Sequence, residues 1–172
     1  MLYTFRIVLD CEQDVFRDIQ IRGNQNFIEL HKTIQNAFGF DDSQISSFYL
    51  SDDDWNKGEE ISMMDMAGEQ GEGTSYSMTD TSIESLAETD GQKLIYVSDF
   101  LLMWCFFVEL VKISEPIKGF VYPNVALSIG NAPDQYSKDG DIEFETDAVK
   151  GKTDGEQDIF DDFNDFDDYQ KF

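Results

Sequence analysis

The sequence predicts an α+β fold: a mixed, mainly antiparallel sheet with one main helix, at about 27–38, and a short helix, at about 80–88, packed on it. Three observations support this prediction. Two N-terminal segments alternate apolar and polar residues, which is the period of a half-buried strand. The main helical segment spaces its apolar residues at helical intervals. Residues 93–113 form a long run of β-branched and aromatic residues, which favour strands.

The N-terminal elements follow one another closely. Residues 3–9 and 15–21 are expected to form two strands, and a third short strand is expected at 48–50. The main helix lies between the second and third strands. Asn26 with Glu29 three residues later is typical of a capping box. The predicted core of sheet and helix comprises Phe5, Ile7, Ile19, Leu30, Ile34, Phe38, Tyr96, Phe106 and Val108.

The apolar run in the second half predicts a hairpin with strands at about 94–98 and 104–113 and a tight turn near 100–103. Its second strand is apolar on both faces, so it is expected to be central and covered on both sides. A membrane helix is the rival interpretation of this run. Asp99 and Glu109 argue against it, because a charge near the bilayer centre costs roughly 2.5–3.5 kcal/mol.

Two acidic segments interrupt or follow this fold. We expect one domain at 1–138, with an acidic, glycine-containing excursion at 51–77 in which 61–66 could be a short strand. A last strand at 119–129 contains a proline, which suits a sheet edge. Residues 139–172 form an acidic tail rich in aromatic residues.

The charge of the chain excludes some partners. The formal net charge is −24, and 51–92 (12 acidic, 1 basic) and 139–172 (13 acidic, 3 basic) carry most of it. Such a field repels phosphates, so no direct nucleic-acid binding is expected. Cys11 and Cys105 form neither a disulfide framework nor a zinc motif, and no signal peptide is recognisable. We therefore expect a cytoplasmic protein with no membrane segment, no cofactor and no defined metal site.

Several motifs resemble the plasmid pRiA-type ORF-three-like family, the open-reading-frame-three proteins named from an Ri plasmid. They are Phe16-Arg17, Leu30-His31, Phe38-Gly39-Phe40, then Tyr96, Asp99, Phe100 and Trp104 in the hairpin, and Tyr122-Pro123. The resemblance covers roughly residues 3–131. It implies an α+β fold and an association with mobile elements, but no established activity.

The chain departs from that family's pattern at three places. A family motif with two histidines is Gln44-Ile45-Ser46-Ser47-Phe48 here. The Gly-Asp of the family's hairpin turn is Leu101-Leu102, and the cysteine- and proline-rich C-terminal motif is replaced by 129–136. If these groups bind a ligand or metal in the relatives, this chain has lost them.

Three residues form a candidate pocket: His31, Asp99 and Trp104. His31 is the only histidine, and its pKa range suits a base. The structural alternative is a histidine at the edge of the core that bonds a carbonyl or carboxylate. Asp99 with Glu109 could perform acid–base chemistry, or could mark where a strand meets an arginine. No catalytic residue is assigned.

A candidate interaction surface combines the hairpin turn with the tail. Apolar residues occupy a turn where Gly, Asn or Asp is usual, and exposed apolar groups need a cover. Tail aromatics recur every three residues, and the methionines Met63, Met64 and Met66 are a second possible cover, in the same chain or a dimer mate. The surface comprises Phe100, Leu101, Leu102, Met103, Phe160, Phe163, Phe166 and Tyr169.

Two functions are compatible with these observations, and a third fits less well. The first is a non-enzymatic interaction module that binds a basic protein. The alternative is an enzyme or small-ligand-binding domain with a pocket between helix 27–38 and the 94–113 hairpin. The third is an acidic decoy that mimics DNA. The sequence leaves open whether the protein is an enzyme, although no motif specifies a reaction.

Overall fold

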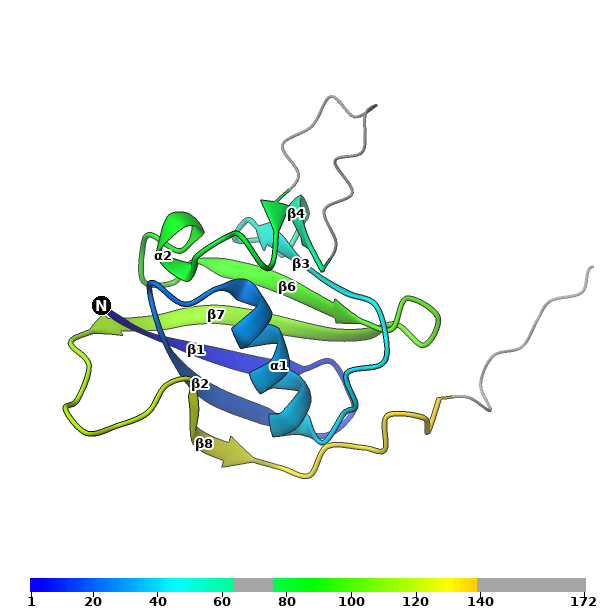
Figure 1. The fold of residues 1–172 in the computed structure, drawn as a ribbon. Coiled ribbons are helices and arrows are strands. Elements are labelled where there is room, and N and C mark those ends of the chain that lie inside the picture. Colours follow the sequence, from blue (N-terminus) through cyan, green and yellow to red (C-terminus); the bar gives the residue numbers. More distant parts are fainter. Residues whose placement is uncertain (64–75, 139–172) are drawn as a thin grey trace, which may run out of the picture. The chain divides into compact units, whose positions relative to one another are not determined.

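The computed structural model describes residues 1–63 and 76–138. Within these residues one eight-stranded sheet has the order β5-β4-β3-β6-β7-β1-β2-β8 (Figure 1). Neighbouring strands are antiparallel, except for the short parallel pair β4 and β5. The strands are β1 (Leu2–Leu9), β2 (Phe16–Arg22), β3 (Ser46–Ser51), β4 (Lys57–Ser62), β5 (Tyr76–Ser77), β6 (Lys93–Ser98), β7 (Trp104–Ser114) and β8 (Asn124–Ile129).

The main helix, α1 (Phe27–Phe38), has the predicted bounds. At its start the Glu29 carboxylate accepts the backbone N–H of Asn26 at 2.9 Å, as in a capping box. At its end Gly39 has a φ of 72°, a conformation that glycine adopts without steric cost. The N–H groups of Gly39 and Phe40 bond the carbonyls of Asn36 and Gln35, which closes the helix.

The hydrophobic core lies between α1 and one face of the sheet (Figure 1). All nine residues predicted for the core are buried there. Edge-to-face ring contacts join the layers: Phe27 meets Phe48 at 5.4 Å, and Phe38 meets Phe106 at 4.9 Å between ring centroids. The fold is nevertheless largely sheet, so it is an α+β protein in which a single long helix covers a broad sheet.

The hairpin prediction is confirmed, and one part of it is wrong. β6 and β7 form the hairpin, and β7 is central, between β6 and β1. Its second face has no helical cover in the described part of the chain. Cys105, Phe107 and Glu109 are half-buried there, and Phe107 is met by the ring of Trp55 at 4.9 Å. Phe107 also pairs with neighbours on β1 and β6, so cross-strand contacts account for the apolar second face.

Other element boundaries differ from the predictions. The acidic excursion contains β4, whose Ile61 is buried opposite Phe48, and this strand begins before the expected range 61–66 and overlaps it at Ile61 and Ser62. The short helix α2 (Ile83–Leu86) is one turn long. β8 is an edge strand, but it begins only after the cis Tyr122–Pro123 bond.

The described helices are too short and too polar to cross a membrane. The run that could have been a membrane helix is instead the β6–β7 hairpin. Residues 64–75 and the predicted tail at 139–172 lie outside the described residues.

Candidate functional site

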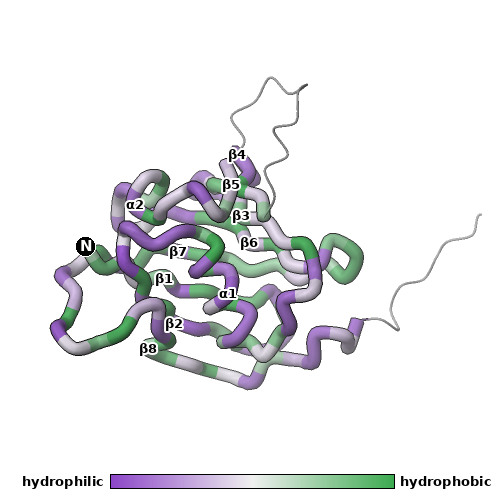
Figure 2. Tube along the Cα trace, in the orientation of Figure 1, coloured by the Kyte–Doolittle hydropathy of each residue, from purple (hydrophilic) through white to green (hydrophobic). Residues whose placement is uncertain are grey.

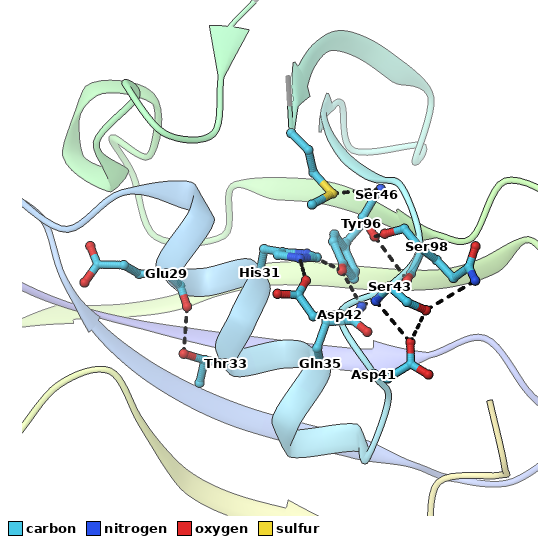
Figure 3. Close-up of polar contacts among 12 residues, drawn as sticks. Glu29, His31, Thr33, Gln35, Asp41, Asp42, Ser43, Ser46, Tyr96 and Ser98 are labelled. Carbon is cyan, nitrogen blue, oxygen red and sulfur yellow. Dashed lines mark hydrogen bonds and ion pairs between the residues drawn. The ribbon is translucent and has the colours of Figure 1, made fainter. Parts of the chain in front are cut away.

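A buried polar network lies under α1, beside the apolar core (Figure 3). α1 contributes His31 and Gln35, which are four residues apart and therefore on one face of the helix. β6 contributes Tyr96 and Ser98, which are two residues apart and therefore on one face of the strand. Ser46 of β3 completes the network. The helix and strand periods place these side chains opposite one another.

His31 is the central residue of the network and is fully buried. Its Nδ1 lies 2.7 Å from the Tyr96 hydroxyl, and its Nε2 lies 2.6 Å from Oδ1 of Asp42. A carboxylate can only accept a hydrogen bond, so Nε2 carries the hydrogen and donates a hydrogen bond to Asp42. Nδ1 is then the acceptor for the Tyr96 hydroxyl. Because burial lowers the pKa of His31, we assign the neutral histidine with this tautomer.

Gln35 extends the network towards the hairpin. Its Nε2 donates to the Tyr96 oxygen at 2.6 Å and to the Ser98 hydroxyl at 2.9 Å. The Ser46 hydroxyl donates to Ser98 at 3.1 Å. Among the described residues the Gln35 carbonyl oxygen has no hydrogen-bond partner, although it is buried. Exchanging the amide oxygen and nitrogen would leave the amine unpaired instead, so one polar atom is unsatisfied in either orientation.

Burial keeps the phenol and the imidazole of the network uncharged. It raises the pKa of Tyr96 to about 12, so the phenol is neutral at physiological pH. It also lowers the pKa of His31, an effect that the Asp42 carboxylate opposes. Asp42 is the one strongly exposed member, with half of its side chain accessible. The network can therefore hold a proton along a fixed chain of groups, whereas its phenol and imidazole are closed to a substrate.

Asp99 has a structural use at the hairpin turn. Its Oδ1 accepts the backbone N–H groups of Leu101 at 3.0 Å and Leu102 at 3.1 Å. Its φ is 60° and that of Met103 is 52°, so both adopt the left-handed conformation that a tight turn requires. Glu109 lies elsewhere, paired with Arg6 of β1 and Lys93 of β6 in the sheet register. The two carboxylates thus serve different parts of the hairpin.

The hairpin tip, Phe100–Met103, presents three apolar side chains to solvent. Leu101 is 70% exposed, Met103 47% and Phe100 43%. Leu102 is only 6% exposed and belongs to the core, so its assignment to the exposed surface is wrong. The Asp99 hydrogen bonds turn the backbone so that this one side chain points inward. Figure 2 shows the tip as a hydrophobic turn beyond β6 and β7.

Trp104 lies at the base of the tip and anchors the C-terminal end of the described chain. Its indole N–H donates to the carbonyl of Gln135 at 2.8 Å. The Lys138 ammonium lies 3.9 Å from the Trp104 ring centroid. It also bonds the carbonyls of Leu102 and Met103, each at 3.3 Å. The chain therefore reaches Lys138 beside the hairpin tip.

The three residues of the predicted pocket take different partners. His31 bonds Tyr96 and Asp42, Asp99 bonds the turn backbone, and Trp104 bonds the segment that ends at Lys138. A surface depression of the described chain lies elsewhere and is lined by Ser51, Asp52, Asp53, Thr89, Asp90, Gly91, Gln92 and Lys93. Among the described residues no group of three or more His, Cys, Asp or Glu side chains is placed to hold a metal.

Sequence reasoning missed several members of this site. Gln35 could have been found, because it lies four residues after His31 on a helix whose neighbouring positions are apolar. Asp42, Ser46 and Ser98 gave no signal, since each bonds a side chain on another part of the fold. Arg17 was noted as part of the Phe16-Arg17 motif of the family resemblance. It is buried and bonds the carbonyls of Phe16, Ala37, Ile129 and Gly130.

The family can now be stated. The sequence profile of the family described as "Plasmid pRiA4b ORF-3-like protein" matches residues 1–166. The chain belongs to this family. No curated protein matches it.

One solved structure is similar to this member of the family in its fold. It is the crystal structure of a protein of unknown function from Methanosarcina mazei Go1. The TM-score is 0.61 at 23% sequence identity, and the match covers 77% of this chain and 71% of that chain. At this identity the likeness concerns the fold alone.

Residues of the motifs that carry the family resemblance form hydrogen bonds between separate elements of the fold. Arg17 ties the end of α1 to the end of β8. His31 and Tyr96 join α1 to β6. Asp99 and Trp104 fix the hairpin turn and the segment that leaves it. These residues therefore have structural roles in this member of the family, apart from any further function.

Proposed function

We propose that the protein is a non-enzymatic protein-interaction module whose recognition surface includes the hairpin tip. The observation that carries the proposal is the preformed apolar turn, in which Asp99 fixes the backbone while Phe100, Leu101 and Met103 remain exposed. A rigid apolar turn loses little conformational entropy on binding, which favours its use as an anchor. The buried side chains of the polar network are not accessible to a partner in this way.

The proposed partner is a basic protein. The chain has 36 acidic and 12 basic residues, so its field attracts Lys- and Arg-rich surfaces and repels nucleic acid. The tail at 139–172 alternates acidic residues with the aromatics Phe160, Phe163, Phe166 and Tyr169. In this proposal the acidic tail raises the rate of association with the basic partner, and the tip supplies apolar contact area. Such a complex weakens as salt rises, because exposed charges are screened.

The test compares two matched variants, Leu101→Ser at the tip and Leu127→Ser on β8, both at exposed positions. The wild-type chain and the variants are immobilised, and proteins captured from the native cytoplasm are quantified at low and high salt. We expect a basic protein to be retained by wild type and Leu127→Ser, and retained several-fold less by Leu101→Ser. Equal retention by both variants would contradict the role of the tip.

A second candidate function rests on one observation. The buried Gln35 carbonyl without a partner favours a small-ligand-binding domain or enzyme, with a pocket between α1 and the hairpin near His31, Asp99 and Trp104. A ligand that satisfied this oxygen would stabilise the folded chain by mass action. Thermal-shift screening with the wild type and Gln35→Met tests it. A compound that raises the melting temperature of wild type alone would favour this alternative over the module.

A further inference from the structure

The two edges of the sheet differ in a way that points to a second binding surface. β5 closes one edge with two residues, and its neighbour β4 carries Lys57, Glu59 and Glu60. β8 closes the other edge with six residues and no charge. Natural sheets protect their edges by keeping edge strands short or charged, because unpaired backbone groups recruit other strands. β8 is neither short nor charged, although it carries a bulge opposite Asp18 and Ile19.

The side chains of β8 reinforce this difference. Val125 and Leu127 are each 41% exposed and Ile129 is 43% exposed. Leu127 and Ile129 share one face of the sheet, whereas Val125 lies beyond a bulge, opposite the core residue Ile19. In the described part of the chain β8 pairs only with β2, so its outer backbone groups have no strand partner. Figure 2 shows β8 as alternating green and pale segments. Exposed apolar residues continue into the loop before it, at Ile117, Phe120 and Val121.

The charge pattern indicates which partner fits this edge. Residues 119–133 contain no Asp, Glu, Lys, Arg or His, in a chain of net charge −24. The wider segment 115–138 has two acidic and two basic residues, so its net charge is zero. A basic partner gains nothing from an uncharged strand. Two copies of this chain repel one another through their acidic segments, and this neutral edge is a place where they can approach closely.

We propose that two copies of the chain form a homodimer by antiparallel pairing of β8 with β8 of the second copy. An isologous contact uses the same patch twice, which requires a self-complementary strand. If the two-fold axis passes at Leu127, this residue meets its own copy, and Ile129 lies on the same face of the sheet as Leu127. The two sheets then become one continuous sheet.

The first test measures association by sedimentation equilibrium of the full chain. Leu127→Lys puts a charge on the axis while lowering the net negative charge, so general repulsion cannot explain a loss of dimer. Because the axis residue occurs twice in the interface, we expect the dissociation constant to rise at least about tenfold. Leu101→Lys, the same change at the tip, is the matched control and should leave the dimer intact.

The dependence on salt distinguishes formation of the dimer from binding of a basic partner. Screening weakens the repulsion between two acidic chains, so the dimer should strengthen as salt rises, whereas binding to a basic partner should weaken. A chain that is monomeric at every concentration and salt overturns the inference. So does a dimer that survives Leu127→Lys, or one that is lost in Leu101→Lys, because the contact would then lie elsewhere.

A cysteine scan tests the register without depending on affinity. In a chain with Cys11→Ser and Cys105→Ser, the variants Leu127→Cys and Val125→Cys are oxidised separately. Facing residues of antiparallel strands have Cα atoms about 4.5–5.5 Å apart, within disulfide range. Cysteines at 125 would lie about 14 Å apart, since four residues of strand separate them. Covalent dimer from Leu127→Cys alone supports the register, and equal yields at both positions would overturn it.

Discussion

Two stripes run side by side along α1, and both are buried against the sheet. One is apolar and contains Leu30, Ile34 and Phe38. The other is polar and contains His31 and Gln35. The apolar stripe needs only partners of suitable volume, which the aromatic residues of β6 and β7 provide. The polar stripe needs a donor or acceptor for each buried atom, because an unpaired buried polar group costs stability.

We expect the polar stripe to add less net stability than the apolar stripe. Burial of apolar groups supplies most of the folding free energy, and a polar network contributes little net unless every member is satisfied. Here the Gln35 carbonyl is unsatisfied among the described residues. The network fixes the positions of the Tyr96 and Ser98 side chains. The next residue, Asp99, holds the backbone of the hairpin tip. The polar stripe therefore connects α1 to the proposed recognition surface.

The largest expected effect is on the apolar stripe. Leu30→Ala and Ile34→Ala each remove a fully buried side chain and leave a cavity, which should lower the free energy of unfolding by about 2–5 kcal/mol. Urea unfolding followed by circular dichroism measures this change. Losses below about half a kilocalorie at both sites would show that α1 does not pack on the sheet through this stripe.

The polar stripe should respond to the loss of one hydroxyl group. Tyr96→Phe keeps the ring but removes the donor to His31 and the acceptor for Gln35, so we expect a loss of about 1–3 kcal/mol. Tyr49→Phe is the matched control, because its hydroxyl makes a long contact with Glu60 at an exposed site, and the substitution should be nearly neutral. Equal effects of the two substitutions would mean that the buried network contributes nothing specific.

A double mutant sharpens this result. Gln35→Met removes the amide together with its unsatisfied oxygen, so Tyr96→Phe should cost less in that background than in the wild type. Residues of one hydrogen-bond network are coupled by about 0.5–3 kcal/mol, whereas independent sites add. Strict additivity would show that Gln35 and Tyr96 act separately despite their 2.6 Å contact.

The two stripes also differ in how far the sequence could predict them. The helical period is enough to predict α1 and its apolar stripe, because it depends on residues within one element. The polar network depends on pairs such as Gln35 and Ser98, which are 63 residues apart, and no local pattern brings them together. β4 was placed too late in the sequence for a related reason, since Ile61 is its one buried apolar residue and pairs with Phe48 of another strand. The tip was predicted as exposed, but the inward turn of Leu102 depends on the Asp99 hydrogen bonds.

The smallest expected effect is the pH dependence that His31 contributes. Its folded-state pKa is lowered by burial, and protonation of Nδ1 would remove the acceptor of the Tyr96 hydroxyl. In the unfolded chain a histidine has a pKa of about 6.5. Between the two pKa values the unfolded state binds more protons, so this contribution to stability is present above about pH 6.5 and is lost as the pH falls.

The His31→Gln variant isolates this contribution, because glutamine does not titrate. Repulsion among the 36 acidic residues acts in the opposite sense, since their protonation relieves it, but it is common to both chains. We therefore compare the change in unfolding free energy between about pH 7.5 and about pH 5, and not its absolute value. The wild type should become less stable relative to the variant as the pH falls. Parallel pH profiles would show that His31 keeps an ordinary pKa, which would require water to reach the imidazole beneath α1.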